Sequence, residues 1–286
     1  MKSIHRSTRR PAPSAVVAAA LLALVVPVTA HEFWVTPSRW VLEPGARATI
    51  LADVGDQFPG GNSYTTPDRI ESIRLVGPDS DTALAPPYRR EKDSLAAEAQ
   101  LPPRPGTYLG VVVVKPRVGD KSGLVFQQHI VHQGLDDVGE SRAKQGETGK
   151  AVRERYSRYG KTLFRVGNGG GTAHVVQPIG LKIELVPQVD PTAVPVGSTL
   201  RFRLLLDGKP APKALVGAIS ATSKSAPESW PLTARTDANG EVGFKLNEPG
   251  PWLVRAVRTV RRTGETGELA ADWESYWASL FFQLAR

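Results

Sequence analysis

Turn signals punctuate the second half of this sequence about every ten residues, and they constrain the possible folds more than any other feature. The segments 207–210, 236–240 and 248–250 combine Asp, Asn, Pro and Gly, and each separates runs in which apolar and polar residues alternate. Short alternating runs joined by tight turns are typical of a β-sandwich. We therefore predict an immunoglobulin-like or transthyretin-like sandwich over residues 179–286.

The first half of the chain predicts a second sandwich, over residues 31–178. Runs rich in β-branched residues at 70–76 and 106–115 indicate strands, and the apolar segment 124–131 is interpreted as a further strand. The segment 149–159 is strongly charged, with spacings that fit a short solvated helix between the two sandwiches. The predicted fold is all-β, with two domains and one short helix.

The first thirty residues have the order of a secretory signal. Four basic residues precede an apolar run at 15–26, and a Val-x-Ala site ends at Ala30. Cleavage after Ala30 predicts a periplasmic protein whose mature chain begins with His31. No later apolar run reaches the ~20 residues that a membrane-spanning helix needs, so no transmembrane segment is expected in the mature chain.

Charge and cysteine content exclude several functional classes. Residues 1–30 hold four of the 36 Lys and Arg and none of the 28 Asp and Glu, so their removal lowers the net charge from +8 to +4. This small excess forms no basic stripe of the kind that binds nucleic acid. The chain contains no cysteine, which excludes disulfides, thiolate metal sites and a cysteine nucleophile.

A mature N-terminal histidine is a candidate metal ligand. It carries an α-amine and an imidazole on one residue, so His31 can chelate a divalent or copper ion through two nitrogens, and with one more imidazole the nitrogen set suits copper or nickel. His129, His132 and His174 are the candidates for a further ligand. If 124–131 is a strand, His129 and His132 point to opposite faces, and both can bind one metal only where the strand ends or bulges.

Other functions remain open at this point. The chain has neither a Gly-x-Ser-x-Gly nor a His-Glu-x-x-His motif, so nothing in it predicts a hydrolase. Trp273 and Trp277 lie on one face of a predicted strand, where such a pair more often packs in a sandwich core or a domain interface than stacks on a sugar. The alternative to a metal function is a module that binds a sugar, a peptide or a partner protein through its β-sandwich surfaces. A redox enzyme with a metal held by an N-terminal histidine is a third alternative.

Five segments resemble one family of exported bacterial proteins, the domain of unknown function 4198. They are Ala-His-Glu-Phe-Trp-Val at 30–35, Arg-Glu-Arg-Tyr-Ser-Arg-Tyr-Gly-Lys at 153–161, Asp-Gly-Lys-Pro at 207–210, Thr-Asp-Ala-Asn-Gly at 236–240 and Asp-Trp-Glu-Ser-Tyr-Trp-Ala-Ser at 272–279. The resemblance implies an all-β exported protein associated with nickel and cobalt uptake, with a membrane metal transporter as partner. His31 falls inside a matched segment, whereas Gly160 stands where the family more often has alanine.

Overall fold

The computed structural model describes residues 32–55, 58–61, 63–223 and 230–285. The predicted signal peptide and His31 lie outside these residues. The helices and strands follow in this order: β1 (Glu32–Pro37), β2 (Val41–Leu42), β3 (Arg47–Gly55), η1 (Pro67–Arg69), β4 (Ile70–Gly77), β5 (Ser80–Ala83), β6 (Arg89–Glu91), β7 (Ser94–Gln100), β8 (Gly106–Lys121), α1 (Gly123–Gln133), α2 (Asp136–Lys144), β9 (Val152–Val166), β10 (Ile183–Pro187), η2 (Pro191–Ala193), β11 (Thr199–Leu206), β12 (Lys209–Pro210), β13 (Leu215–Ser220), β14 (Leu232–Arg235), β15 (Glu241–Lys245), β16 (Pro251–Arg261) and β17 (Trp273–Gln283).

The strands of the described residues form three sheets, and the longest sheet contains strands from both halves of the chain. Its order is β14-β13-β16-β17-β9-β8-β4-β5, and β2 also pairs with β9. A smaller sheet has the order β1-β3-β7-β6, and another is built on β10 and β11. The predicted all-β, immunoglobulin-like sandwich architecture is confirmed. The two halves meet where β17 pairs in parallel with β9.

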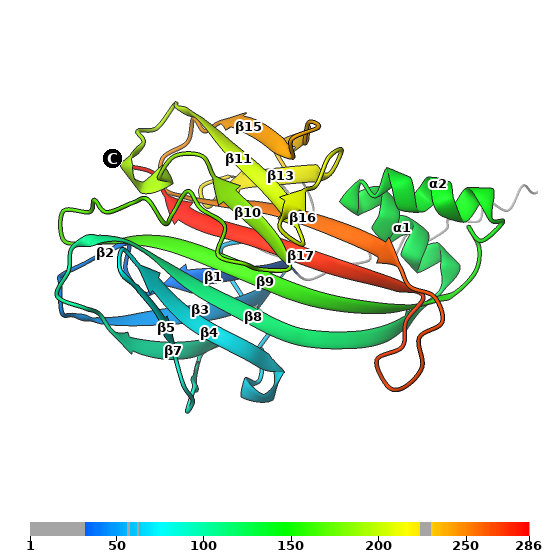
Figure 1. The fold of residues 1–286 in the computed structure, drawn as a ribbon, viewed down its shortest axis with the longest axis horizontal. Coiled ribbons are helices and arrows are strands. Elements are labelled where there is room, and N and C mark those ends of the chain that lie inside the picture. Colours follow the sequence, from blue (N-terminus) through cyan, green and yellow to red (C-terminus); the bar gives the residue numbers. More distant parts are fainter. Residues whose placement is uncertain (1–31, 56–57, 62, 224–229, 286) are drawn as a thin grey trace, which may run out of the picture.

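Alternate residues of β17 face opposite sides of the long sheet, as the period of a strand requires. Tyr276, Leu280 and Phe282 lie in the largest core, which β10, β11 and β15 cover. Trp273 packs with residues of α1 and α2, and Phe281 packs with Trp34 of β1. The long sheet is therefore the middle of three layers (Figure 1).

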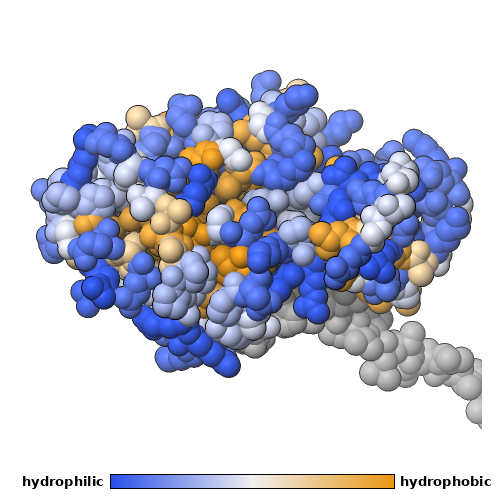
Figure 2. Space-filling view, turned by 60° about the horizontal axis from the view of Figure 1, so that its bottom comes forward, coloured by the Kyte–Doolittle hydropathy of each residue, from blue (hydrophilic) through white to orange (hydrophobic). Residues whose placement is uncertain are grey.

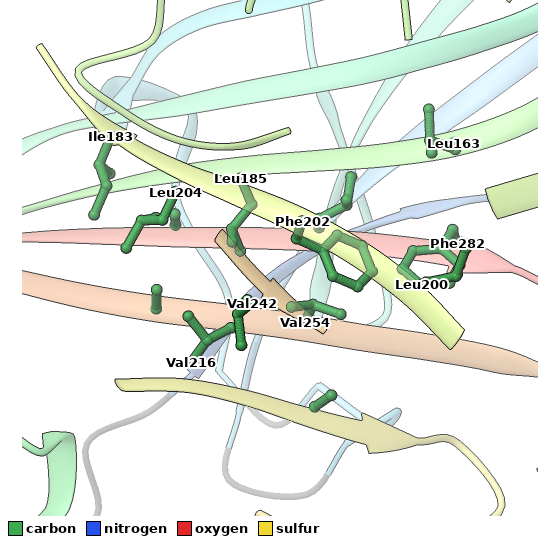
Figure 3. Packing of buried hydrophobic residues seen from close by; sticks show 14 of the residues in the cluster. Leu163, Ile183, Leu185, Leu200, Phe202, Leu204, Val216, Val242, Val254 and Phe282 are labelled. Atoms are coloured by element: carbon green, nitrogen blue, oxygen red, sulfur yellow. The ribbon is translucent and has the colours of Figure 1, made fainter. Parts of the chain in front are cut away.

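The largest core is closed by side chains that interdigitate between two sheets. Figure 3 shows Leu185 and Phe202, from β10 and β11, pointing toward Val254 and Phe282 on β16 and β17. All four are buried.

One face of the surface carries a band of apolar residues between hydrophilic margins (Figure 2). No helix among the described residues is long and apolar enough to span a membrane.

Two predictions for the middle of the chain are wrong. The segment 124–131 lies in helix α1. Ser122 is the N-cap of this helix, and its Oγ accepts a hydrogen bond from Val125 N at 3.3 Å; Gly134, with φ 61°, is the C-cap. The buried positions of α1 recur at the three- and four-residue spacing of a helix. The apolar content of the segment was therefore misleading, whereas its N-cap serine and C-terminal glycine are the signals of a helix.

Most of the predicted helix at 149–159 instead belongs to strand β9, which begins at Val152. Its charged side chains have partners on neighbouring elements rather than in solvent: Arg155 Nη2 donates to Glu274 Oε2 of β17 at 2.7 Å. Charge density indicates exposure only when the charges lack partners within the fold. The helices lie just before this segment, at α1 and α2, at one end of the long sheet (Figure 1).

Gly160 lies in β9 where β1 crosses the sheet. A Cβ atom there would come within 2.5 Å of Val35 Cγ2 and 2.7 Å of Phe33 Cε1. We expect Gly160→Ala to lower the free energy of unfolding by about 1–3 kcal/mol, because both neighbours are buried and must move. Gly119→Ala is the control, since a Cβ at Gly119 meets nothing within 4 Å. Urea denaturation measures both; equal stabilities of the two variants would contradict the expectation.

Candidate functional site

The described chain begins beside the last turn of α1. Glu32, the first residue of β1, has its Oε1 atom 3.6 Å from Nε of Arg255 on β16. The same guanidinium donates from Nη1 to Oε1 of Gln133, the last residue of α1. Arg255 also lies over the Trp230 ring, with 4.4 Å between Cζ and the ring centroid. The start of β1 is therefore linked through one buried arginine to the helix that carries two of the candidate histidines.

Helix α1 changes the relation between His129 and His132. On a strand the two residues point to opposite faces, but on a helix residues three apart are neighbours. His129 is buried under the helix, with 2% of its surface exposed, whereas His132 is exposed. The pair therefore lies on one helix, with one imidazole in the core and the other at the surface.

His129 lies between aromatic rings and a buried carboxylate. Its ring is stacked on Phe126 at 5.9 Å between centroids and lies 5.7 Å from the Trp277 ring. Its Nε2 atom is 3.5 Å from Oε1 of Glu154 on β9, outside hydrogen-bonding geometry. Glu154 Oε2 lies 2.5 Å from Lys121 Nζ, and its Oε1 accepts a hydrogen bond from Ser275 Oγ.

This environment keeps the His129 imidazole neutral. Burial lowers the pKa of His129 to about 4. The negative charge of Glu154 opposes this shift, whereas Lys121, His132 and Arg255 add to it. A neutral imidazole has a lone pair for a metal. The nitrogen of His129 nearest Glu154 is nevertheless enclosed, so an ion would have to enter under α1 to reach it.

His174 belongs to another part of the molecule. It is half-buried in a turn after β9. Burial lowers the pKa of His174, whereas the backbone of Thr107 and Gly171 and the carboxylate of Asp190 act to raise it. None of these residues neighbours His129 in the fold, so the structure does not bring the two imidazoles together. Within the described ranges, no group of three or more His, Cys, Asp or Glu side chains is arranged to hold a metal ion.

The acidic residues near the end of the chain are engaged with arginines. Glu274 lies 2.7 Å from Arg155 and 2.6 Å from Arg262. Burial acts to raise the pKa of Glu274, but the hydrogen bonds of Arg155, Tyr276 and Arg262 outweigh it and lower that pKa to about 2. Asp272 Oδ2 accepts from the backbone of Arg153 at 2.8 Å. Both carboxylates therefore hold β9 and β17 together.

The tryptophans of β17 do not form a surface platform. Trp273 and Trp277 are 3% and 8% exposed, and Trp273 packs on Phe126 of α1. Burial in a core or an interface is what the sequence favoured for this pair, but the covering element was missed, because the helix that packs on the two tryptophans was predicted as a strand. Arg255 and Gln133 were also missed, since their meeting depends on α1 crossing the sheet.

Comparison with known proteins identifies the family and otherwise adds little. No curated protein matches the chain. Among solved structures, a mutant of Salmonella alpha-2-macroglobulin is 13% identical with a TM-score of 0.23; the match covers 88% of this chain and 15% of that one. The D0-D1 domain of Intimin is 11% identical, with a TM-score of 0.21, and the match covers 87% of this chain and 97% of that one. A DUF4785 family protein from Legionella pneumophila is 12% identical, with a TM-score of 0.26 and coverage of 78% and 50%.

These structural likenesses are too distant to carry an inference about function. The family model is different, because it matches residues 28–260, which include the start of β1, both helices and most of the long sheet. The matched range also contains His129, His132 and His174. The chain belongs to the family described as Domain of unknown function (DUF4198).

Proposed function

We propose that the mature protein binds a divalent transition metal, nickel, cobalt or copper, through the α-amine and imidazole of His31. A further imidazole comes from His132 of α1. The protein is then a periplasmic accessory that carries the ion to a membrane metal transporter. The proposal requires cleavage after Ala30, since only cleavage creates the free amine.

The link from Glu32 through Arg255 to Gln133 is the observation that carries the proposal. His31 is one residue from Glu32, and consecutive Cα atoms are about 3.8 Å apart. His132 is one residue from Gln133 and is exposed. Each histidine therefore directly precedes a residue that contacts Arg255. This common contact supports a nitrogen site that His31 and His132 share near the last turn of α1.

The chemistry of the donors favours these metals over magnesium or calcium. Amine and imidazole nitrogens suit nickel, cobalt and copper, whereas magnesium and calcium prefer oxygen ligands. Glu32, the residue after His31 in the chain, already has Arg255 beside its carboxylate, which reduces the value of that carboxylate as an oxygen ligand.

The test is calorimetric titration of nickel(II) and copper(II) into protein purified after export, with its N-terminus established by mass spectrometry. We expect one ion per chain. His31→Ala, or one extra residue before His31, weakens binding by about 100-fold because the chelate loses a nitrogen donor. His132→Gln weakens binding by about tenfold.

His174→Gln is the matched control, because His174 lies in a separate turn and should leave the affinity unchanged. Absence of binding by protein that begins at His31 contradicts the proposal. Binding that survives both His31→Ala and the N-terminal extension contradicts it equally.

A further inference from the structure

A pocket of about 410 Å³ lies beside β9, at the point along this strand where pairing with β17 has ended and pairing with β2 begins. The pairing of β17 with β9 ends at Phe281 and Thr162, and that of β2 with β9 begins at Val41 and Arg165. Leu163 falls between these two pairings and lines the pocket. The other lining residues are Trp40, Val41, Arg165, Thr192, Gln283 and Leu284. Ligand pockets commonly have volumes of about 300–1,000 Å³.

Arg165 and Gln283 give this pocket two polar side chains that are available to a ligand. Both are half-buried, and across the described part of the chain neither side chain has a hydrogen bond or an ion pair. Thr192 is already engaged, because its Oγ1 lies 2.8 Å from Asp190 Oδ1. No Asp or Glu is among the described residues that line the pocket, so none of them competes as a carboxylate partner for the Arg165 guanidinium.

The rest of the pocket is apolar and is fixed in shape. The ring of Trp40 is packed edge-on against Phe281, with 4.9 Å between centroids, and Phe281 is itself buried. Leu163 and Leu284 are buried, and Val41 adds an aliphatic wall at the rim. An indole held on one side presents its remaining surface to a flat ring.

We infer that this pocket binds a small aromatic carboxylate, with its ring against Trp40, its carboxylate on Arg165 and a polar ring substituent at Gln283. Arginine pairs with carboxylates through two parallel hydrogen bonds, which favours an anion of this geometry. A sugar acid fits less well, because it carries a hydroxyl on almost every carbon and each one that is buried without a partner costs free energy. Two available polar side chains match one carboxylate and one further polar group.

This site is independent of His31 and of any metal. It lies at the end of the long sheet where β2 and the C-terminal end of the chain are found, away from α1 and α2 (Figure 1). A failure of the metal proposal therefore leaves this inference intact, and the reverse also holds.

The experiment uses 4-hydroxybenzoate as the probe and 4-hydroxybenzamide as its neutral analogue, followed by ligand-observed NMR and calorimetry. We expect the carboxylate to bind about tenfold more tightly than the amide, and Arg165→Gln to remove that preference. Gln283→Ala weakens both ligands. Both substitutions are at half-buried positions, and circular dichroism verifies the fold.

Arg201→Gln, at an exposed arginine of β11 outside the pocket, is the matched control and should keep the preference. Three results overturn the inference: no saturable binding at millimolar 4-hydroxybenzoate, a preference for the carboxylate that survives Arg165→Gln, or tighter binding of D-glucuronate than of 4-hydroxybenzoate.

Discussion

Glu184→Gln should lower the free energy of unfolding by about 3–5 kcal/mol, the largest effect we expect from a single substitution in this protein. Glu184 Oε1 lies 2.8 Å from Lys161 Nζ, and the two side chains are 1% and 2% exposed. The carboxylate also accepts hydrogen bonds from the backbone N–H groups of Ile179 and Leu181. The amide removes the negative charge and replaces one acceptor oxygen by a donor, so a buried cation loses its partner.

Burial lowers the pKa of Lys161 against the charge of Glu184. Removing the negative charge of Glu184 leaves the Lys161 ammonium buried with no opposite charge beside it. Lys161→Met in the Glu184→Gln background should therefore recover much of the loss, because the cation is gone and the introduced amide oxygen can still accept from the backbone.

Glu241→Gln is the control for this pair. Glu241 Oε1 lies 2.7 Å from Arg203 Nη2, but that arginine side chain is 48% exposed, so the loss should be below about 1 kcal/mol. Chemical denaturation of the three variants measures these differences. A double variant less stable than Glu184→Gln alone would contradict the account of an uncompensated buried charge.

Acidification should destabilise the protein through His129. Its pKa is 6.5 when unperturbed and about 4 in the fold. Below pH 6.5 the unfolded chain binds a proton that the folded chain excludes, so stability falls as the pH decreases from 6.5 toward 4. The loss from this one residue is about 3 kcal/mol. Above pH 6.5 both states are neutral at this position and His129 makes no contribution to the pH dependence.

The test compares unfolding free energies at pH 7 and pH 4.5 for the wild type and two variants. His129→Gln should lose part of the pH dependence, because glutamine does not titrate. His132→Gln, at an exposed position of the same helix, should retain it. The differences between variants isolate His129 from Glu154 and the other carboxylates that titrate in this range. An unchanged difference between pH 7 and pH 4.5 in His129→Gln would contradict the assignment.

Most strands could be predicted from the sequence, because turn residues mark where they begin or end. The run at 106–115 is rich in β-branched residues and lies in β8, which begins at Gly106 and continues to Lys121. The turn predicted at 207–210 likewise falls where Asp207 and Gly208 join β11 to β12. Such signals lie within a few residues of the element that they define.

The middle of the chain could not be predicted in the same way, because its signals depend on distant residues. Arg155 resembles a residue of a solvated helix until Glu274, on β17, is known to lie beside it. Val131 is 72% exposed in α1, so apolar content alone did not distinguish a helix with an exposed apolar side from a strand. Charge and hydrophobicity become informative here only after the fold supplies the partners.

The candidate site was predictable in its parts and not in its arrangement. The histidines could be named from the sequence, but the relation of His129 to His132 depended on whether the segment is a helix or a strand. Arg255, which links β1 to α1, gives no local signal of that role. His31 remains a prediction, since it lies outside the described residues.

The parallel pairing of β9 with β17 has a consequence for how the chain reaches its native state. β17 is the last strand in chain order among the described residues, yet it lies between β16 and β9 in the middle of the long sheet. The strands synthesised earlier, β9 among them, therefore keep the apolar surface that β17 covers exposed until residues 273–283 have been synthesised. Pairings between such distant segments slow folding and lengthen the period of exposure to aggregation. A chain that passes through a membrane unfolded would complete its core only after almost all of it has crossed.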